Sequence, residues 1–293
     1  RLDLRFPLDL LVRDVKAVEP NTNDTLLSLE RLKVELRLWK LLKKEVEIEE
    51  ISIRNATFDT RDFIDGIVVN GHLGELFLES HGVVFSPETA RINEFSVKNT
   101  DVSLTLENME DTDTTTTEPI YWKILLDEID FENVGFALKM PQDSLFVRTM
   151  LPKTTLKDGV IDLKEASYYV ESFEMDNAEL AYGPKKELLL QKIGLQLDSI
   201  YYCGRDIRAN IEEFIFKERS GLELVSTEGR IKADSAFIQI PKFTMRTTAS
   251  SLDLQTKIGW NVLEMKKTGA LSARINAEIG KSDVAKILGG RDT

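Results

Sequence analysis

An eight-residue pattern occurs four times in this chain and constrains its fold more than any other feature. It reads apolar, any, apolar, any, Asn, small, any, apolar, and it occupies Ile51–Phe58, Phe95–Val102, Ile129–Phe136 and Phe173–Leu180. Its asparagines are 44, 34 and 44 residues apart. Repetition at intervals of roughly 20–50 residues is typical of proteins built by adding similar units side by side. The pattern therefore favours an extended β structure over a compact enzyme.

The asparagines are predicted to bend the strands that carry them. Ile51 and Ile53 share one side of a strand, yet Phe58 lies an odd number of positions from Ile53. A strand that keeps all three residues on its apolar side must absorb one extra residue, as a β-bulge does. Asparagine tolerates left-handed backbone angles and suits that place. The expected positions, within one bent strand or where two strands meet, are Asn55, Asn99, Asn133 and Asn177. The alternative is four unrelated strand ends that each carry Asn.

Most of the chain alternates apolar and polar residues, which is the period of a half-buried strand. Helix signals are confined to a short turn at 39–44 and a short helix at 282–288, which Ser282 would cap. Residues 67–85 indicate two short strands around Gly71 and Gly74, and residues 222–225 and 229–231 indicate two more. No strand–helix–strand rhythm occurs, so a parallel α/β fold is not expected. The predicted fold class is mainly β: an elongated, curved, mostly antiparallel repeat sheet that forms an open trough, with a few short helices.

An acidic, threonine-rich stretch at residues 107–119 divides the chain. Such a sequence cannot bury apolar surface and predicts a loop or linker. Residues 1–106 then form an N-terminal β-repeat unit, and residues 120–293 form a second one. The sequence leaves open whether the two units share one continuous sheet.

The composition excludes several classes of function. A formal net charge of −12 argues against nucleic acid as a partner, because nucleic acid requires a basic surface. The single cysteine, Cys203, has no partner in the chain, so neither a disulfide framework nor a cysteine metal site is expected. No apolar run approaches the ~20 residues that span a bilayer. The sequence begins without Met, and we expect it to be a segment of a longer protein.

Residues suited to catalysis are scarce. The histidines are His72 and His81, and the chain has neither a phosphate-binding glycine loop nor a Gly-x-Ser-x-Gly elbow. Glu75 and Glu79 lie near His81, but a zinc site needs several converging ligands, and exposed polar side chains are the simpler interpretation. We therefore expect no enzymatic activity, no cofactor and no metal.

The apolar sides of these strands have to be covered or left open. Periodicity alone favours an ordinary sandwich core, in which sheets cover one another. With so few helices to act as lids, the alternative is an apolar groove. A groove lined by aliphatic and aromatic side chains suits an acyl chain.

Stretches spread over most of the chain resemble TamB-like proteins of the AsmA-like superfamily, in the form found in the Bacteroidota. These stretches are residues 2–7, 24–29, 38–42, 46–58, 214–224 and 243–252, whereas the acidic stretch at 107–119 fits no part of the family pattern. The resemblance implies the membrane-proximal segment of a long periplasmic protein, anchored in the inner membrane by a helix outside this segment. It further implies a β trough with an apolar interior that acts in outer-membrane biogenesis. Such a trough conducts phospholipid between the membranes or assists an outer-membrane β-barrel protein.

On this resemblance, the partners are phospholipid acyl chains, an outer-membrane β-barrel protein and the inner membrane, and no residue is catalytic. The predicted lining of the trough consists of the apolar repeat residues Ile51, Ile53, Phe58, Phe95, Val97, Ile129, Phe131, Phe136, Phe173, Met175 and Leu180. Two alternatives stay open: a parallel β-helix that acts on carbohydrate, with asparagines at its corners, and an adhesion or scaffold protein. A continuous open apolar groove would favour lipid, and dry, closed packing would favour a scaffold.

Overall fold

The computed structural model describes residues 2–5, 9–20, 22–41, 47–61, 66–85, 88–107, 121–183, 185, 187–265 and 269–289. Within these ranges the chain forms fifteen strands and three short helices. The strands are β1 (Leu2–Arg5), β2 (Asp9–Val18), β3 (Thr25–Leu36), β4 (Ile48–Asp59), β5 (Ile67–Phe85), β6 (Glu88–Leu106), β7 (Lys123–Met140), β8 (Leu145–Asp162), β9 (Ser167–Tyr182), β10 (Leu188–Cys203), β11 (Asp206–Glu218), β12 (Glu223–Ala233), β13 (Phe237–Thr247), β14 (Ser251–Gly259) and β15 (Leu271–Glu278). The helices are α1 (Leu38–Leu41), α2 (Trp260–Leu263) and α3 (Lys281–Gly289).

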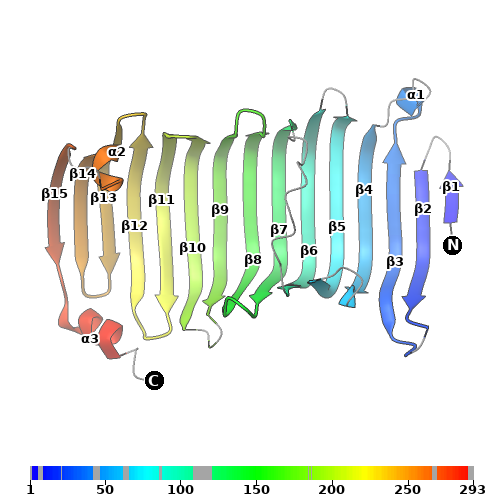
Figure 1. Cartoon of the computed structure of the whole chain (residues 1–293), viewed down its shortest axis with the longest axis horizontal. Helices are drawn as coiled ribbons and strands as arrows, with labels where there is room; N and C mark the ends of the chain where they lie inside the picture. Colours follow the sequence, from blue (N-terminus) through cyan, green and yellow to red (C-terminus); the bar gives the residue numbers. More distant parts are fainter. Residues whose placement is uncertain are drawn as a thin grey trace.

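All of these strands lie in one sheet, in which they follow the order of the sequence (Figure 1). Neighbouring strands are antiparallel except β6 and β7, which are parallel. The expected fold class is confirmed: mainly β, elongated, mostly antiparallel and open, because β1 and β15 are separate edges. This order excludes a parallel β-helix. α1 and α2 lie at one rim of the sheet, called here the α2 rim, and α3 lies at the opposite rim, the α3 rim (Figure 1).

Short links between antiparallel neighbours follow from local turn chemistry. Gly204 and Arg205 alone connect β10 to β11, and Gly204 has a φ of 57°. Gly221, in the link from β11 to β12, has a φ of 87°. Glycine adopts such left-handed angles without the steric cost that a Cβ brings, so these positions suit tight hairpin turns.

The parallel pair β6–β7 joins the two predicted units into one sheet. Its register runs from Thr89 opposite Lys123 to Thr105 opposite Lys139, which covers nearly the whole of both strands. The chain therefore leaves β6 at the α3 rim and enters β7 at the α2 rim. Apart from Glu107, the predicted linker at 107–119 lies outside the described residues.

Three local predictions were wrong. Residues 67–85 form the single strand β5, because Gly71 and Gly74 admit a close neighbour instead of breaking the strand. A Cβ at Gly71 would lie 2.3 Å from the carbonyl oxygen of Asp101, and one at Gly74 would lie 2.6 Å from that of Asn99. Residues 222–225 and 229–231 fall in or beside the single strand β12. Helix α3 begins at Lys281, so Ser282 lies in its first turn and is not its cap.

Candidate functional site

Cross-strand register places one apolar residue of each strand from β2 to β15 in a single unbroken line. We call the side on which Ile51 lies the inner face and this line the central row. The central row consists of Leu10, Val34, Ile51, Leu78, Phe95, Ile129, Leu156, Phe173, Leu197, Ile211, Gly229, Phe243, Leu254 and Ile275. At roughly 4.8 Å between neighbouring strands, the row is about 62 Å long. It crosses the sheet at right angles to the strands.

All of the predicted lining residues lie on the inner face. Those absent from the central row fall into two flanking rows. The second row consists of Leu32, Ile53, Leu76, Val97, Phe131, Thr154, Met175 and Leu195. The third row consists of Leu27, Phe58, Gly71, Val102, Phe136, Thr149, Leu180 and Leu190. No charged residue occurs in any of the three rows.

Sequence reasoning missed the inner-face residues of the intervening strands. Leu78 on β5, Leu156 on β8 and Leu197 on β10 lie directly beside predicted residues. These strands lack the asparagine pattern, so nothing in the sequence fixed their register against the repeats. The alternation of apolar and polar residues was the signal that could have found them. It predicts which residues share a face of the sheet, but not which residues of neighbouring strands lie opposite each other.

No second layer covers the inner face in the part of the chain that the structure describes. Each strand packs mainly against its neighbours in the sheet, and α2 packs beside β14. Val97 in the middle of the face is 7% exposed, but Phe136 is 40% exposed, and no large described side chain is fully buried. An uncovered apolar face that crosses the whole sheet is typical of an interaction site.

The bend positions keep the inner face apolar along the length of each strand. Asn55, Asn99, Asn133 and Asn177 have φ angles of 47°, 51°, 54° and 54°, and each lies inside one continuous strand. Their side chains are exposed on the outer face, where Asn133 Nδ2 donates to Asn99 Oδ1 at 3.4 Å.

The small residue after each asparagine turns back toward the inner face. Ala56 is 8% exposed and Ala178 is 0% exposed, so the apolar face continues across the bend. Gly74 lies between Asn55 and Asn99 in the register, and Pro152 lies between Asn133 and Asn177. The bends of neighbouring strands are therefore aligned across the sheet.

The outer face carries rows of charged residues. One row alternates in sign from β4 to β9 and consists of Arg54, Glu75, Lys98, Glu132, Lys153 and Asp176. Lys98 Nζ lies 3.2 Å from Glu132 Oε2. A second row is acidic and consists of Asp9, Glu35, Glu50, Glu79, Glu94 and Glu128. Lys33 Nζ bridges two of its members, at 2.8 Å from Glu35 and 3.0 Å from Glu50. These rows make the outer face a hydrated surface.

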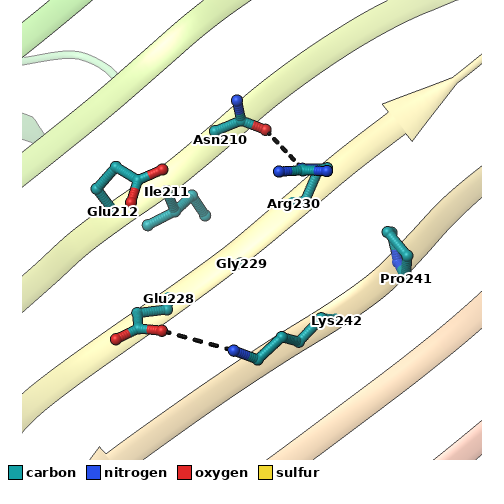
Figure 2. Close-up of a pocket in the computed structure, with 8 residues that line it drawn as sticks. All are labelled: Asn210, Ile211, Glu212, Glu228, Gly229, Arg230, Pro241 and Lys242. Carbon is teal, nitrogen blue, oxygen red and sulfur yellow. Dashed lines mark hydrogen bonds and ion pairs between the residues drawn. The ribbon is translucent and has the colours of Figure 1, made fainter.

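A hollow of about 290 Å³ lies among charged side chains of β11, β12 and β13 (Figure 2). Arg230 Nε donates to Asn210 Oδ1 at 3.0 Å, and Lys242 Nζ lies 3.7 Å from Glu228 Oε2. Both cations thus have partners on a neighbouring strand. This hollow is a weaker candidate for a functional site than the inner face.

Neither a metal centre nor a membrane-spanning helix occurs among the described residues. No three His, Cys, Asp or Glu side chains there are placed to hold a metal ion. Of the residues considered for such a site, His81 Nδ1 contacts Asn93 Oδ1, while Glu75 faces Arg54. None of the described helices has the length and hydropathy needed to cross a bilayer.

Neither protein-family models nor curated proteins match this chain.

Proposed function

We propose that this chain is a non-enzymatic segment of a cell-envelope protein whose inner face binds phospholipid acyl chains and conducts them along the central row. The observation that carries the proposal is that row, which is apolar in every strand from β2 to β15 and has no covering layer among the described residues. The resemblance to TamB-like proteins supplies the setting: the periplasm, between an inner-membrane anchor and the outer membrane. Assistance to an outer-membrane β-barrel protein is the second activity that this resemblance suggests.

The physical basis is the transfer of an acyl chain from water to an apolar surface. Each CH₂ group that leaves water contributes about 0.8 kcal/mol. One leaflet of a bilayer core is about 15 Å thick, and the central row is several times longer, so the face has room for several chains. Neighbouring positions in the row have similar chemistry, and an acyl chain that shifts by one strand exchanges one apolar surface for another. The charged outer face confines the acyl chain to the inner side of the sheet.

Native mass spectrometry of the purified chain, followed by lipid extraction, tests the proposal. We expect phospholipid to copurify, and we expect Ile53→Asp and Met175→Asp to remove it. Thr57→Asp is the matched control, because it places the same carboxylate on the exposed outer side of β4. Circular dichroism and urea denaturation establish that each variant is folded.

A wild-type chain that carries no lipid and takes none from phospholipid vesicles would contradict lipid conduction and favour a scaffold. Loss of lipid from Thr57→Asp to the same extent as from Ile53→Asp would show that the inner face is not the binding surface.

A further inference from the structure

Two Tyr-Tyr pairs face each other at the α2 rim. Tyr168 and Tyr169 follow Ser167, the first residue of β9, and Tyr201 and Tyr202 precede Cys203, the last residue of β10. Tyr168 lies opposite Tyr202, and Tyr169 lies opposite Tyr201. Tyr168 and Tyr202 pair in a row that continues from Ile161 on β8. A second line of bends, with Asp158 at a φ of 51° and Ser199 at a φ of 53°, shifts the alternation by one position between this row and the central row, so the row lies on the inner face. Because side chains alternate along a strand, Tyr169 and Tyr201 lie on the outer face. The four residues are thus two matched sets, one on each side of the sheet.

The outer tyrosines have polar partners. Tyr169 Oη donates to Glu171 Oε2, and this hydrogen bond to a carboxylate raises the pKa of Tyr169 above its ordinary value. The guanidinium carbon of Arg208 lies 4.7 Å from the centroid of the Tyr201 ring, a cation–π contact. Both outer tyrosines therefore have a charged partner within the protein, Tyr169 through its hydroxyl and Tyr201 through the face of its ring.

The inner tyrosines differ. Their ring centroids are 6.0 Å apart with an interplanar angle of 39°, and Tyr168 and Tyr202 are 40% and 45% exposed. Neither hydroxyl makes a hydrogen bond to another described residue. The rings extend the apolar face to the place where the strands end, beside the turn at residues 163–166. Exposed Lys164 lies in that turn and forms no ion pair with a described residue.

Tyr182 repeats this placement at the other end of β9. It lies on the inner face at the α3 rim, opposite Leu188, and is 49% exposed. A ring on an apolar surface with a hydroxyl at its border is how tyrosine sits at a membrane–water interface.

We infer that Tyr168 and Tyr202 bind the headgroup phosphate of a phospholipid whose acyl chains lie on the inner face. The inference rests on the proposed function and adds the polar half of the ligand to it. The two phenolic hydroxyls donate hydrogen bonds to phosphate oxygens, and the Lys164 ammonium in the adjoining turn attracts the negative charge. The headgroup thereby stays at the α2 rim, in contact with water, while the acyl chains occupy the rows between the rims.

Binding of two fluorescent lipids with identical acyl chains tests the inference. One is a phosphatidylethanolamine, and the other is a diacylglycerol, which lacks the phosphate. In the wild-type chain we expect the phospholipid to bind more tightly than the diacylglycerol. In the double variant Tyr168→Phe/Tyr202→Phe we expect the affinity for the phospholipid to fall about tenfold, since hydrogen bonds to a charged group are lost, and the affinity for diacylglycerol to stay unchanged.

The outer double variant Tyr169→Phe/Tyr201→Phe is the matched control, and it should bind both lipids as the wild-type chain does. If the wild-type chain bound the two lipids with equal affinity, the inference would be overturned but the proposed function would not. The same would follow if the inner double variant lost affinity for both lipids to the same extent. Displacement of the phospholipid by inorganic phosphate would indicate a site for free phosphate and would also overturn it. A wild-type chain that binds neither lipid would overturn the proposed function, and the inference with it.

Discussion

The inner and outer faces of β9 differ residue by residue. Met175 and Leu180 lie on the inner face, and Asp176 and Glu179 lie on the outer face. Strict alternation would turn Leu180 outward, but Asn177, with a φ of 54°, shifts the pattern by one position. The comparison teaches that a single-layer sheet with strands of this length keeps one face apolar along its whole width by bending its strands at aligned positions. The predictions below test that separation, from the largest expected effect to the smallest.

A charge placed at the buried bend should have the largest effect. Ala178 is 0% exposed, and Ala178→Glu should lower the free energy of unfolding by about 3–5 kcal/mol, because it buries an unpaired carboxylate. Urea denaturation measures the change. The neighbouring outer-face variant Glu179→Ala should stay within about 0.5 kcal/mol of wild type. Similar losses for both variants would mean that the two faces are not energetically distinct.

Gly74 tests the close approach of β5 and β6 along the aligned bends. Gly74→Ala should lower the free energy of unfolding by about 1–3 kcal/mol, because the new Cβ would lie 2.6 Å from the Asn99 carbonyl oxygen. Gly159→Ala serves as the control, since its Cβ would meet only side-chain atoms at 3.3 Å. Equal denaturation midpoints for Gly74→Ala and the wild-type chain would contradict the close packing at this bend.

Asn99 tests the left-handed backbone itself. Asn99→Ala should lower the free energy of unfolding by about 1–2 kcal/mol, because a residue with a Cβ and no compensating hydrogen bond disfavours a φ of 51°. Asn99→Gly should cost less than Asn99→Ala, since glycine adopts this angle readily. If denaturation showed a larger loss of stability for Asn99→Gly than for Asn99→Ala, the side chain of Asn99 would contribute more to stability than its backbone conformation does.

The attachment of α3 should depend on pH. Hydrogen bonds from Ser250 Oγ and Thr247 Oγ1 lower the pKa of Asp283 below its ordinary value. A carboxyl group has a pKa near 4 in the unfolded chain. When its pKa is lower in the folded state, its ionised form stabilises that state at pH values above the unfolded pKa. This stabilisation is lost as the pH falls through the pKa of the folded state.

The protection factors of residues 281–289, which correct the exchange rates for the intrinsic effect of pH, should therefore fall below about pH 4 while those of the strands stay high. In Asp283→Asn, the protection factors of this helix should hardly vary over that range. Protection factors in the wild-type helix that are independent of pH would contradict this role of Asp283.

An ion pair on the outer face should have the smallest effect. The Lys98 and Glu132 side chains are 42% and 56% exposed, so Lys98→Met should change the free energy of unfolding by at most about 0.5 kcal/mol. Lipid copurification should be unaffected. A loss of bound lipid from this variant would show that the outer face takes part in binding.

The sequence predicted the chemistry of the strands better than their pairing. Alternation assigned Ile51, Ile53 and Phe58 to one side, and the asparagine pattern located four of the left-handed residues but not those at Asp158 and Ser199. Both signals are local, because they depend on side-chain period and on which residues tolerate a positive φ. The parallel pairing of β6 with β7 is not local, since no residue in either strand distinguishes a parallel neighbour from an antiparallel one.

The extent of the candidate site also could not be predicted from the sequence. The central row exists only when all registers are known, and a slip of one residue in any strand would interrupt it. Gly71 and Gly74 suggested breaks in β5 because glycine is common in turns, whereas their role is to admit the backbone of β6. The separate roles of Tyr168 and Tyr169 likewise became apparent only from their partners across the sheet.

Site-specific photocrosslinking tests the central claim most directly. A photoreactive phenylalanine analogue replaces Phe131 on the inner face or Phe77, which lies on the outer face between Ser52 and Ser96. The two chains are incubated with phospholipid vesicles, irradiated and analysed by mass spectrometry. Lipid conduction on the inner face predicts a phospholipid adduct at position 131 and none at position 77. Equal adducts at both positions, or an adduct at position 77 alone, would contradict it.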